Sequence, residues 1–218
     1  MPHDHHDDDF HHHGMSPSGH PYRADDDHPL TYWQTMEIAM RELLTEKAIL
    51  TPAEIAAQID AMDSREPANG AAVVARAWMD PEFKSRLLAN ASDASREMGF
   101  DIGPMHLIAL ENTADTHNVI VCTLCSCYPR NLLGLPPDWY KSRSYRSRVV
   151  KEPRKVLAEF GLSLPKGTTL RIHDSTADMR YIVLPARPKG TDGWSAEDLA
   201  TLVTRDSMIG VGVPKSPS

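Results

Sequence analysis

The sequence predicts an α+β protein in which a helical N-terminal arm leads into a mixed α/β domain. Apolar residues recur at helical spacing through residues 31–98. From residue 106 onward, short runs rich in β-branched residues alternate with helical segments. All three cysteines lie in this second part, within one six-residue stretch. We therefore expect a tail over residues 1–28, a helical arm over 29–100 and an α/β domain over 101–218.

The composition is typical of a globular protein. Hydrophobic residues make up 41% of the 218 residues, which is enough for a packed core. No run approaches the roughly 20 apolar residues that a membrane helix needs, and the acidic, His-rich N-terminus does not resemble a signal peptide. The net charge of -7 includes seven Asp in the first 28 residues, so the remainder is close to neutral. We expect a cytoplasmic protein with no nucleic-acid or membrane partner.

The first 28 residues differ from the rest of the chain in composition. They hold eight of the eleven His residues and almost no apolar side chains, so they cannot bury enough surface to fold. We interpret them as a disordered His/Asp-rich tail. Two hypotheses stay open: transient capture of a divalent metal by imidazoles and carboxylates, or a solvated tail without a role.

Residues 31–98 contain well-marked helix starts. Thr51-Pro52-Ala53-Glu54 offers a capping hydroxyl, a proline at the first helical position and a carboxylate that can reach back. Asp80-Pro81 repeats the cap and the proline, and Gly99 fits the left-handed residue that ends the third helix. The Met and aromatic stripes of these helices indicate packing against a core or a partner.

The second part is predicted to contain short strands and two helices. A helix is expected over 145–160, with a kink or a restart at Pro153, and a short helix opens at Ser195. The expected strands are 106–110, 119–122, 170–173, 181–184 and a last strand over 208–213.

Cys122, Cys125 and Cys127 have the spacing C-x-x-C-x-C at the end of an expected strand. A turn can bring three such thiolates onto one ion, and soft sulfur ligands favour zinc, copper(I), iron or cobalt over magnesium or calcium. Metal binding is therefore the leading interpretation. A redox switch or inert thiols stay open as alternatives.

Three thiolates are one ligand fewer than a structural zinc site usually has. His117, five residues before the first cysteine, is a weak candidate for the fourth ligand. Alternatively, the main-chain amides of Ser126 and Cys127 can complete the site if they lose their protons. That step requires a small trivalent ion, because zinc is a poor agent for it.

Longer motifs around these cysteines resemble the metal-binding (alpha) subunit of the nitrile hydratases, with the thiocyanate hydrolase gamma subunit as a close relative. The resemblance extends from about residue 30 to residue 215. Thr123 in CTLCSC is typical of the cobalt enzymes of this family. The motifs are VCTLCSCYPR (121–130), GLPPDWYK (134–141), YRSRVV (145–150), EPR (152–154), MRY (179–181), GTDGW (190–194) and VTRD (203–206).

The resemblance implies a metal centre in the loop 122–127 of a catalytic α/β domain of the nitrile hydratase alpha-subunit type. One low-spin Co(III) per chain is bound by the sulfurs of Cys122, Cys125 and Cys127 and by the main-chain nitrogens of Ser126 and Cys127. The sixth position is left for water or substrate. Cys125 is then oxidised to sulfinate and Cys127 to sulfenate, and both take part in catalysis.

The implied reaction is the hydration of a nitrile to an amide. The metal withdraws electron density from the triple bond, and the Cys127 sulfenate either attacks or orients the attacking water. Arg180 matches a family arginine near the centre, so we expect it to support the oxidised sulfurs. A surface or structural ion pair is the alternative role for Arg180.

Arg130 is the point at which the sequence departs from many nitrile hydratases, which carry tryptophan there. The arrangement Tyr128-Pro129-Arg130 resembles the thiocyanate hydrolases, and a guanidinium favours an anion such as thiocyanate. The alternative function is therefore the gamma subunit of a cobalt thiocyanate hydrolase, which releases carbonyl sulfide and ammonia. A further alternative is a non-catalytic thiolate metal module.

The resemblance also implies partners. The helical arm over 29–100 is expected to pack on a beta-type subunit that completes the pocket, in a heterodimer or a higher hetero-oligomer. The small-molecule partner is a nitrile or thiocyanate. Whether a helper protein loads the cobalt is left open.

Overall fold

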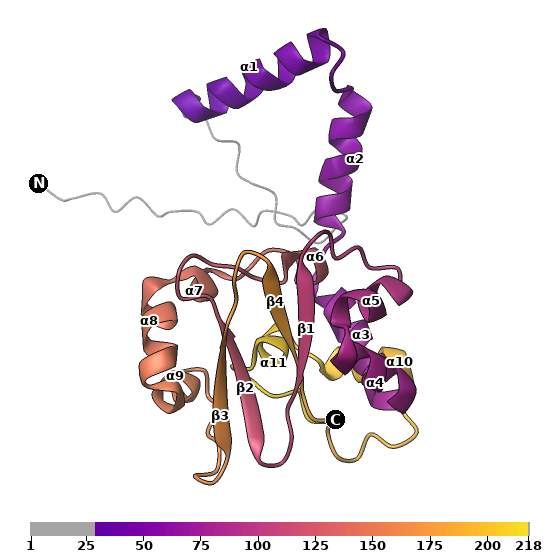
Figure 1. Cartoon of the computed structure of the whole chain (residues 1–218), viewed down its shortest axis with the longest axis vertical. Helices are drawn as coiled ribbons and strands as arrows, with labels where there is room; N and C mark the ends of the chain where they lie inside the picture. Colours follow the sequence, from indigo (N-terminus) through magenta and orange to yellow (C-terminus); the bar gives the residue numbers. More distant parts are fainter. Residues whose placement is uncertain (1–28, 218) are drawn as a thin grey trace, which may run out of the picture. The chain divides into compact units, whose positions relative to one another are not determined.

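The computed structural model describes residues 29–217 (Figure 1). The tail expected over residues 1–28 lies outside the described residues. The chain divides into two compact units, Met1–Ser64 and Arg65–Ser218. The predicted α+β fold is confirmed, and no helix among the described residues is long and apolar enough to cross a membrane.

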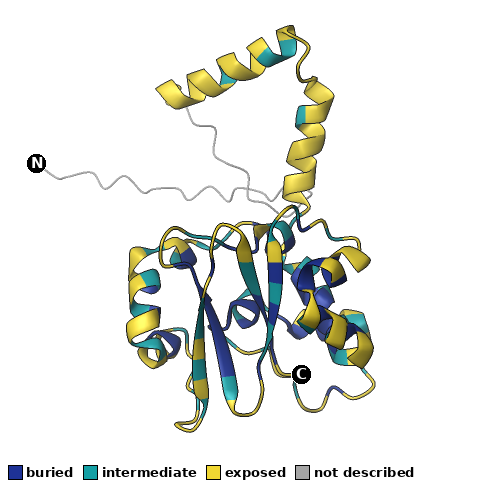
Figure 2. Cartoon of the chain, viewed as in Figure 1, coloured by how far each residue is buried: buried dark blue, intermediate teal, exposed yellow. Residues whose placement is uncertain are grey.

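The first unit contains two helices, α1 (Tyr32–Glu46) and α2 (Pro52–Asp63). Each helix begins with a capping box. In α1 the Thr31 hydroxyl accepts from the amide of Gln34, and the Gln34 side chain accepts from the amide of Thr31. Thr51 and Glu54 form the same two hydrogen bonds at the start of α2. Neither helix contains a buried residue (Figure 2). The exposed apolar side chains include Tyr32, Trp33, Met36, Met40, Leu43, Ile59 and Met62.

The second unit is built on four short strands, β1 (His106–Glu111), β2 (Thr116–Val121), β3 (Thr169–Asp174) and β4 (Met179–Leu184). β1 pairs with β4 and β2 pairs with β3, and both pairings are parallel. β3 and β4 follow each other along the chain, but each pairs with one of the two earlier strands and not with the other. A long crossover between β2 and β3 makes the parallel arrangement feasible.

Three helices pack within the second unit although we expected them in the arm. They are α3 (Pro67–Met79), α4 (Pro81–Ala89) and α5 (Ala91–Glu97). α4 and α5 contact β1, and α3 contacts α10 (Ala196–Leu202). Val73, Val74 and Phe83 are fully buried, which ties these helices to the core. The boundary between compact units accordingly falls after Ser64 rather than after residue 100.

The crossover from β2 to β3 contains four helices. They are α6 (Arg130–Leu133), α7 (Asp138–Lys141), α8 (Arg143–Lys151) and α9 (Pro153–Glu159). The predicted restart at Pro153 is confirmed. Trp139, Tyr140, Tyr145 and Phe160 form an aromatic cluster in this segment, with ring centroids 4.8 to 6.1 Å apart.

The prediction of a strand over residues 208–213 is wrong. The segment instead contains α11 (Arg205–Ile209), which a Thr204–Ser207 capping box starts and Gly210 ends in the left-handed conformation. A Cβ at Gly210 would lie 2.0 Å from the Asn118 carbonyl oxygen, so the close approach to β2 requires glycine. A short, fully buried apolar run has no periodicity that separates a helix from a strand.

Candidate metal centre

The three cysteines lie directly after β2. The segment over residues 122–129 has no helix or strand, and Val121 pairs in register with Asp174, the last residue of β3. The amide of Ser175 donates to the Val121 carbonyl at 2.7 Å, so two parallel strands end together at the start of the cysteine loop. This edge is where ligands bind in sheets of parallel strands.

The three thiols converge as the spacing predicts. The sulfur of Cys125 lies 3.4 Å from that of Cys122 and 3.1 Å from that of Cys127, and all three are free thiols. Their ligand atoms lie within 4.8 Å of one another, and among the described residues no other three His, Cys, Asp or Glu side chains come together in this way. Cys122 is buried, Cys127 is half-buried and Cys125 is exposed. The cluster is therefore accessible from one side.

The loop alters the acidity of two of its thiols in opposite directions. Hydrogen bonds to the Cys127 and Cys122 thiols lower the pKa of Cys125 to about 7, and the main-chain amides of Ser126 and Cys127 act in the same direction. Burial raises the pKa of Cys127 to about 12, whereas the charge of Arg180 lowers it. Metal ligation requires thiolates, so binding of a cation must release the protons that these sulfurs share.

The donor set fits a thiophilic cation. Three sulfurs face one another at distances that one ion can span, and the amides of Ser126 and Cys127 lie close enough to act on the Cys125 sulfur. Cys122, Cys125, Ser126 and Cys127 are thus brought together as expected. No fourth side-chain ligand joins the cluster among the described residues, which leaves room for main-chain donors and a further small ligand.

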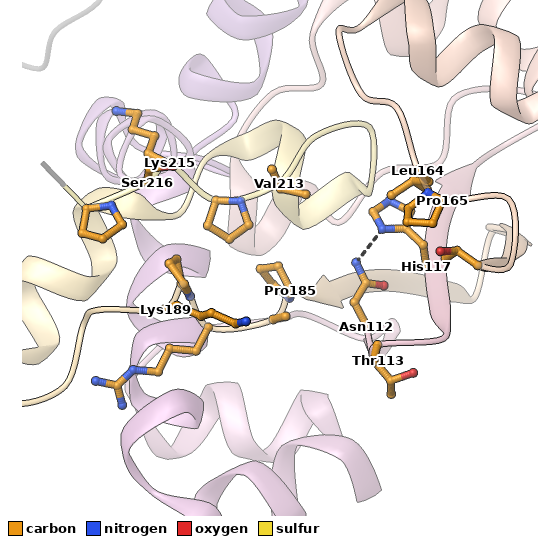
Figure 3. A pocket seen from close by; sticks show the side chains of 17 residues that line it. Asn112, Thr113, His117, Leu164, Pro165, Pro185, Lys189, Val213, Lys215 and Ser216 are labelled. Atoms are coloured by element: carbon orange, nitrogen blue, oxygen red, sulfur yellow. Dashed lines mark hydrogen bonds between the residues drawn. The ribbon is translucent and has the colours of Figure 1, made fainter.

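His117 does not belong to the metal cluster, and its candidacy as fourth ligand is wrong. It lies at the start of β2, where it is 4% exposed and lines a cavity of ≈490 Å³ (Figure 3). Its Nε2 donates to the Gly210 carbonyl at 2.7 Å, and its Nδ1 accepts from Asn112 at 3.2 Å. Burial lowers the pKa of His117, so the ring is neutral and both nitrogens are occupied.

Thr123 is held by the carboxylate of Asp174. The Thr123 amide donates to Oδ1 at 2.9 Å and its hydroxyl donates to Oδ2 at 2.5 Å. Arg146 on α8 donates to the Thr123 carbonyl at 3.4 Å. Sequence reasoning missed Asp174 because it lies fifty-one residues from Thr123 and only the β2–β3 register brings it to the loop.

Two phenols contact the backbone near the cysteines, and sequence reasoning missed both. The Tyr140 hydroxyl donates to the Cys127 carbonyl at 2.8 Å, and the Tyr145 hydroxyl donates to the Ile120 carbonyl at 2.7 Å. Both residues lie in motifs that carried the family resemblance. The motifs marked these segments as part of the family resemblance, but nothing in the local sequence predicted which main-chain carbonyl each tyrosine would bind.

Arg180 and Arg130 lie in different environments. Arg180 is on β4, its Nη1 donates to the Met179 carbonyl at 3.3 Å, and its buried Nε has no hydrogen-bond partner among the described residues. Its charge acts on the pKa of Cys127, so it lies near the cluster. Arg130 is the first residue of α6, and its exposed side chain forms no hydrogen bond or ion pair within residues 29–217.

A groove of ≈750 Å³ lies beside the cysteine loop and is open to solvent. Leu124, one of the two residues between Cys122 and Cys125, is 90% exposed on this side. The groove contains cationic side chains and no acidic one. It is lined by Thr123, Leu124, Arg143, Arg146, Ser147, Val150 and Lys151.

Comparison with known proteins gives a consistent result. A family model described as nitrile hydratase, alpha chain, matches residues 31–212. The chain is 51% identical over 184 residues to the low-molecular weight cobalt-containing nitrile hydratase subunit alpha of Rhodococcus rhodochrous, a match that covers 83% of this chain and 88% of the relative. It is 43% identical over 195 residues to the thiocyanate hydrolase subunit gamma of Thiobacillus thioparus, covering 84% and 80%.

Solved structures agree with the sequence comparisons. A structure of recombinant thiocyanate hydrolase with partially modified cobalt centres matches with a TM-score of 0.78 and 42% identity, covering 86% of this chain and 92% of that chain. A double mutant of the Fe-type nitrile hydratase from Comamonas testosteroni Ni1 matches with a TM-score of 0.75 and 44% identity, covering 85% of this chain and 91% of that chain. The fold of this chain is therefore similar to the folds of these two solved chains.

Proposed function

Because the chain belongs to the nitrile hydratase alpha-chain family, we propose that it is the metal-carrying catalytic subunit of a cobalt nitrile hydratase. The reaction is the hydration of a nitrile to the corresponding amide. The observation that carries the proposal is the convergence of Cys122, Cys125 and Cys127, with one face of the cluster accessible.

The proposed ligands of one cobalt per chain are three sulfurs and two main-chain nitrogens. The sulfurs are those of Cys122, Cys125 and Cys127, and the nitrogens are those of Ser126 and Cys127. When bound, Co(III) supplies Lewis-acid activation of a nitrile, a contribution of several kcal/mol to the transition state. Asp174 holds Thr123 and so keeps the loop in place for these ligands.

Cys125 and Cys127 are the proposed catalytic residues. Cys125 is exposed and has a lowered pKa, which are the conditions that favour oxidation to sulfinate. An external oxidant such as dioxygen would have to supply the two oxygens of Cys125 and the one oxygen of the half-buried Cys127. The sulfenate oxygen of Cys127 would then either attack the nitrile carbon or orient the attacking water. Arg180, whose buried Nε has no hydrogen-bond partner among the described residues, would donate to these anionic oxygens.

The partner is a beta-type subunit. α1 and α2 expose most of their apolar side chains, among them Trp33, which is 78% exposed. Exposed apolar surface of this extent is a mark of an interaction site. We propose that this helical arm packs on the partner in a heterodimer or higher hetero-oligomer, within the cytoplasm. A helper protein for cobalt loading belongs to the same proposal.

Thiocyanate hydrolysis is the second candidate, and Arg130 favours it. The guanidinium is exposed and unpaired within the described residues, three positions after Cys127. The groove beside the loop adds Arg143, Arg146 and Lys151 without an acidic residue. Cations at the mouth of a site raise the local concentration of an anion.

Turnover by the assembled cobalt-loaded complex tests the proposal. We expect acrylonitrile to be converted to acrylamide, whereas thiocyanate is not consumed. Turnover of thiocyanate alone would replace the first function by the second. Arg130→Trp, matched with Arg171→Trp at an exposed arginine of β3 that does not line the groove, sharpens the assay, because only the Arg130 change should abolish any thiocyanate turnover. Stoichiometric zinc with three unoxidised cysteines would support a non-catalytic metal module instead.

A further inference from the structure

We infer that Tyr140 is a positioning residue for the metal loop, which acts through the peptide carbonyl of Cys127. This inference rests on the proposed function, because it assigns a role to Tyr140 in the same metal centre. Tyr140 lies in α7, thirteen residues after Cys127, and it is fully buried. Its hydroxyl reaches the loop from outside the cysteine segment.

The Cys127 carbonyl depends on this phenol. The Tyr140 hydroxyl is its only hydrogen-bond donor among the described residues, at 2.8 Å. The loop from Cys122 to Pro129 has no helix or strand that would otherwise fix its peptide planes. Loss of the phenol hydroxyl would leave the carbonyl without that partner, and the peptide plane would be free to rotate.

That peptide plane joins Cys127 to Tyr128 and is bonded to the Cα of Cys127, which also carries the proposed sulfur and nitrogen ligands. The hydrogen bond from Tyr140 therefore anchors the chain directly after these ligands. Without this anchor, the chain on that side is free to move, and the Cα of Cys127 can shift together with both ligands. Groups that hold ligands in this way tune a metal centre although they do not touch the metal.

The surroundings of Tyr140 hold the phenol in one place as a donor. Its ring lies edge-on to that of Tyr128, with centroids 5.1 Å apart, and is tilted against that of Tyr145 at 5.8 Å. A carbonyl oxygen can only accept a hydrogen bond, so the phenol that binds the Cys127 carbonyl carries its proton. A rigid, protonated phenol is suited to fix a carbonyl rather than to exchange protons with the substrate.

Tyr145 offers a matched control. It belongs to the same aromatic cluster, is also buried, and its hydroxyl also donates to a main-chain carbonyl. That carbonyl belongs to Ile120, a residue inside β2, whose backbone is paired along its length with β3. Tyr145→Phe therefore removes the same chemical group from the same cluster without releasing the cysteine loop.

The test compares Tyr140→Phe with Tyr145→Phe in the assembled cobalt-loaded complex. We expect Tyr140→Phe to lose cobalt to a chelator roughly 10- to 100-fold faster, the range typical of groups that orient metal ligands. Its sulfur-to-cobalt absorption band should shift, and kcat should fall more than KM changes. Tyr145→Phe should keep the band and the cobalt retention of the wild type. Equal retention and equal spectra in the two variants would overturn the inference.

A second substitution covers the case in which Tyr140→Phe does not assemble. Replacement of Tyr140 by 3-fluorotyrosine keeps the ring and hydroxyl but strengthens the donor, so the absorption band should still move. An unchanged band would again contradict the inference. A wild-type complex that holds cobalt and shows the band, but hydrates no nitrile, would sink the proposed function while the comparison of the tyrosine variants still decides the role of Tyr140.

Discussion

His117 lies at the start of β2, and Cys122, Cys125 and Cys127 lie just beyond its other end. The imidazole is enclosed, and both of its nitrogens have protein partners. The three thiols, by contrast, contact mainly one another, and Cys125 is exposed to solvent. The comparison shows that a metal-binding side chain is available as a ligand only where the fold leaves its donor atom unused.

The two ends also differ in what holds them. At the cysteine end, side chains from distant segments bind the loop backbone: Asp174 binds Thr123 and Tyr140 binds Cys127. At the other end, the His117 side chain binds the carbonyl of Gly210 at the end of α11, and the Asn112 side chain binds His117 and the amide of Asn118. At the cysteine end, these hydrogen bonds fix the loop backbone and leave the thiols free to bind a metal ion. At the His117 end, the polar side chains themselves form the hydrogen bonds that stabilise the fold.

The largest effect is expected at Cys127. Cys127→Ala removes a proposed ligand and the sulfenate oxygen together, so activity should fall by several orders of magnitude. Turnover of acrylonitrile by the assembled complex measures the loss of activity, and its cobalt content measures the loss of the ligand. Activity close to that of the wild type would show that the cysteine end of β2 is not the catalytic centre.

A smaller loss is expected at Asp174. Asp174→Asn weakens both hydrogen bonds to Thr123, so cobalt affinity or activity should fall by roughly 10- to 100-fold. Asp115→Asn is the matched control, because this exposed carboxylate lies beside the start of β2. Competition with a chelator measures cobalt affinity. Equal losses in the two variants would mean that the carboxylate of Asp174 does not hold the loop.

His117 should affect stability and not metal binding. His117→Gln should lower the free energy of unfolding at neutral pH by about 1–3 kcal/mol, because buried partners lose a hydrogen bond. Cobalt content should equal that of the wild type. A loss of cobalt in this variant, with assembly intact, would remove the distinction between the two ends of the strand.

The pH dependence of stability follows from the lowered pKa of His117. Above the unfolded-state pKa near 6.5 the ring is neutral in both states, and its contribution to stability is complete. As the pH falls below that value, the unfolded chain binds a proton that the folded chain does not, and stability is lost. Denaturant unfolding at pH 8 and at pH 5.5 should show a smaller acid loss for His117→Gln than for the exposed-site control His106→Gln.

Local sequence patterns predicted the cysteine loop and most of the strands. Thiols at C-x-x-C-x-C spacing can converge whatever the rest of the chain does, and β1 and β2 consist of short runs bounded by turn residues. The capping residues Thr51 and Asp80 likewise act within one helical turn. These features depend on neighbours in the sequence.

The groups that hold the loop could not be predicted because they depend on distant contacts. Asp174 reaches Thr123 through the β2–β3 register, and Tyr140 reaches Cys127 through the packing of α7. The error at residues 208–213 has the same origin, since the approach of Gly210 to Asn118 fixes the end of α11. Helices α3 to α5 joined the second unit through contacts with β1 and α10.

Direct analysis of the metal and the sulfurs in the native complex tests the central claim most closely. The account predicts one cobalt per chain, with X-ray absorption showing sulfur and nitrogen neighbours. Mass spectrometry of the peptide that contains Cys122–Cys127 should show two added oxygens on Cys125 and one on Cys127. Fully active protein with neither cobalt nor iron, or with three unmodified thiols, would contradict it.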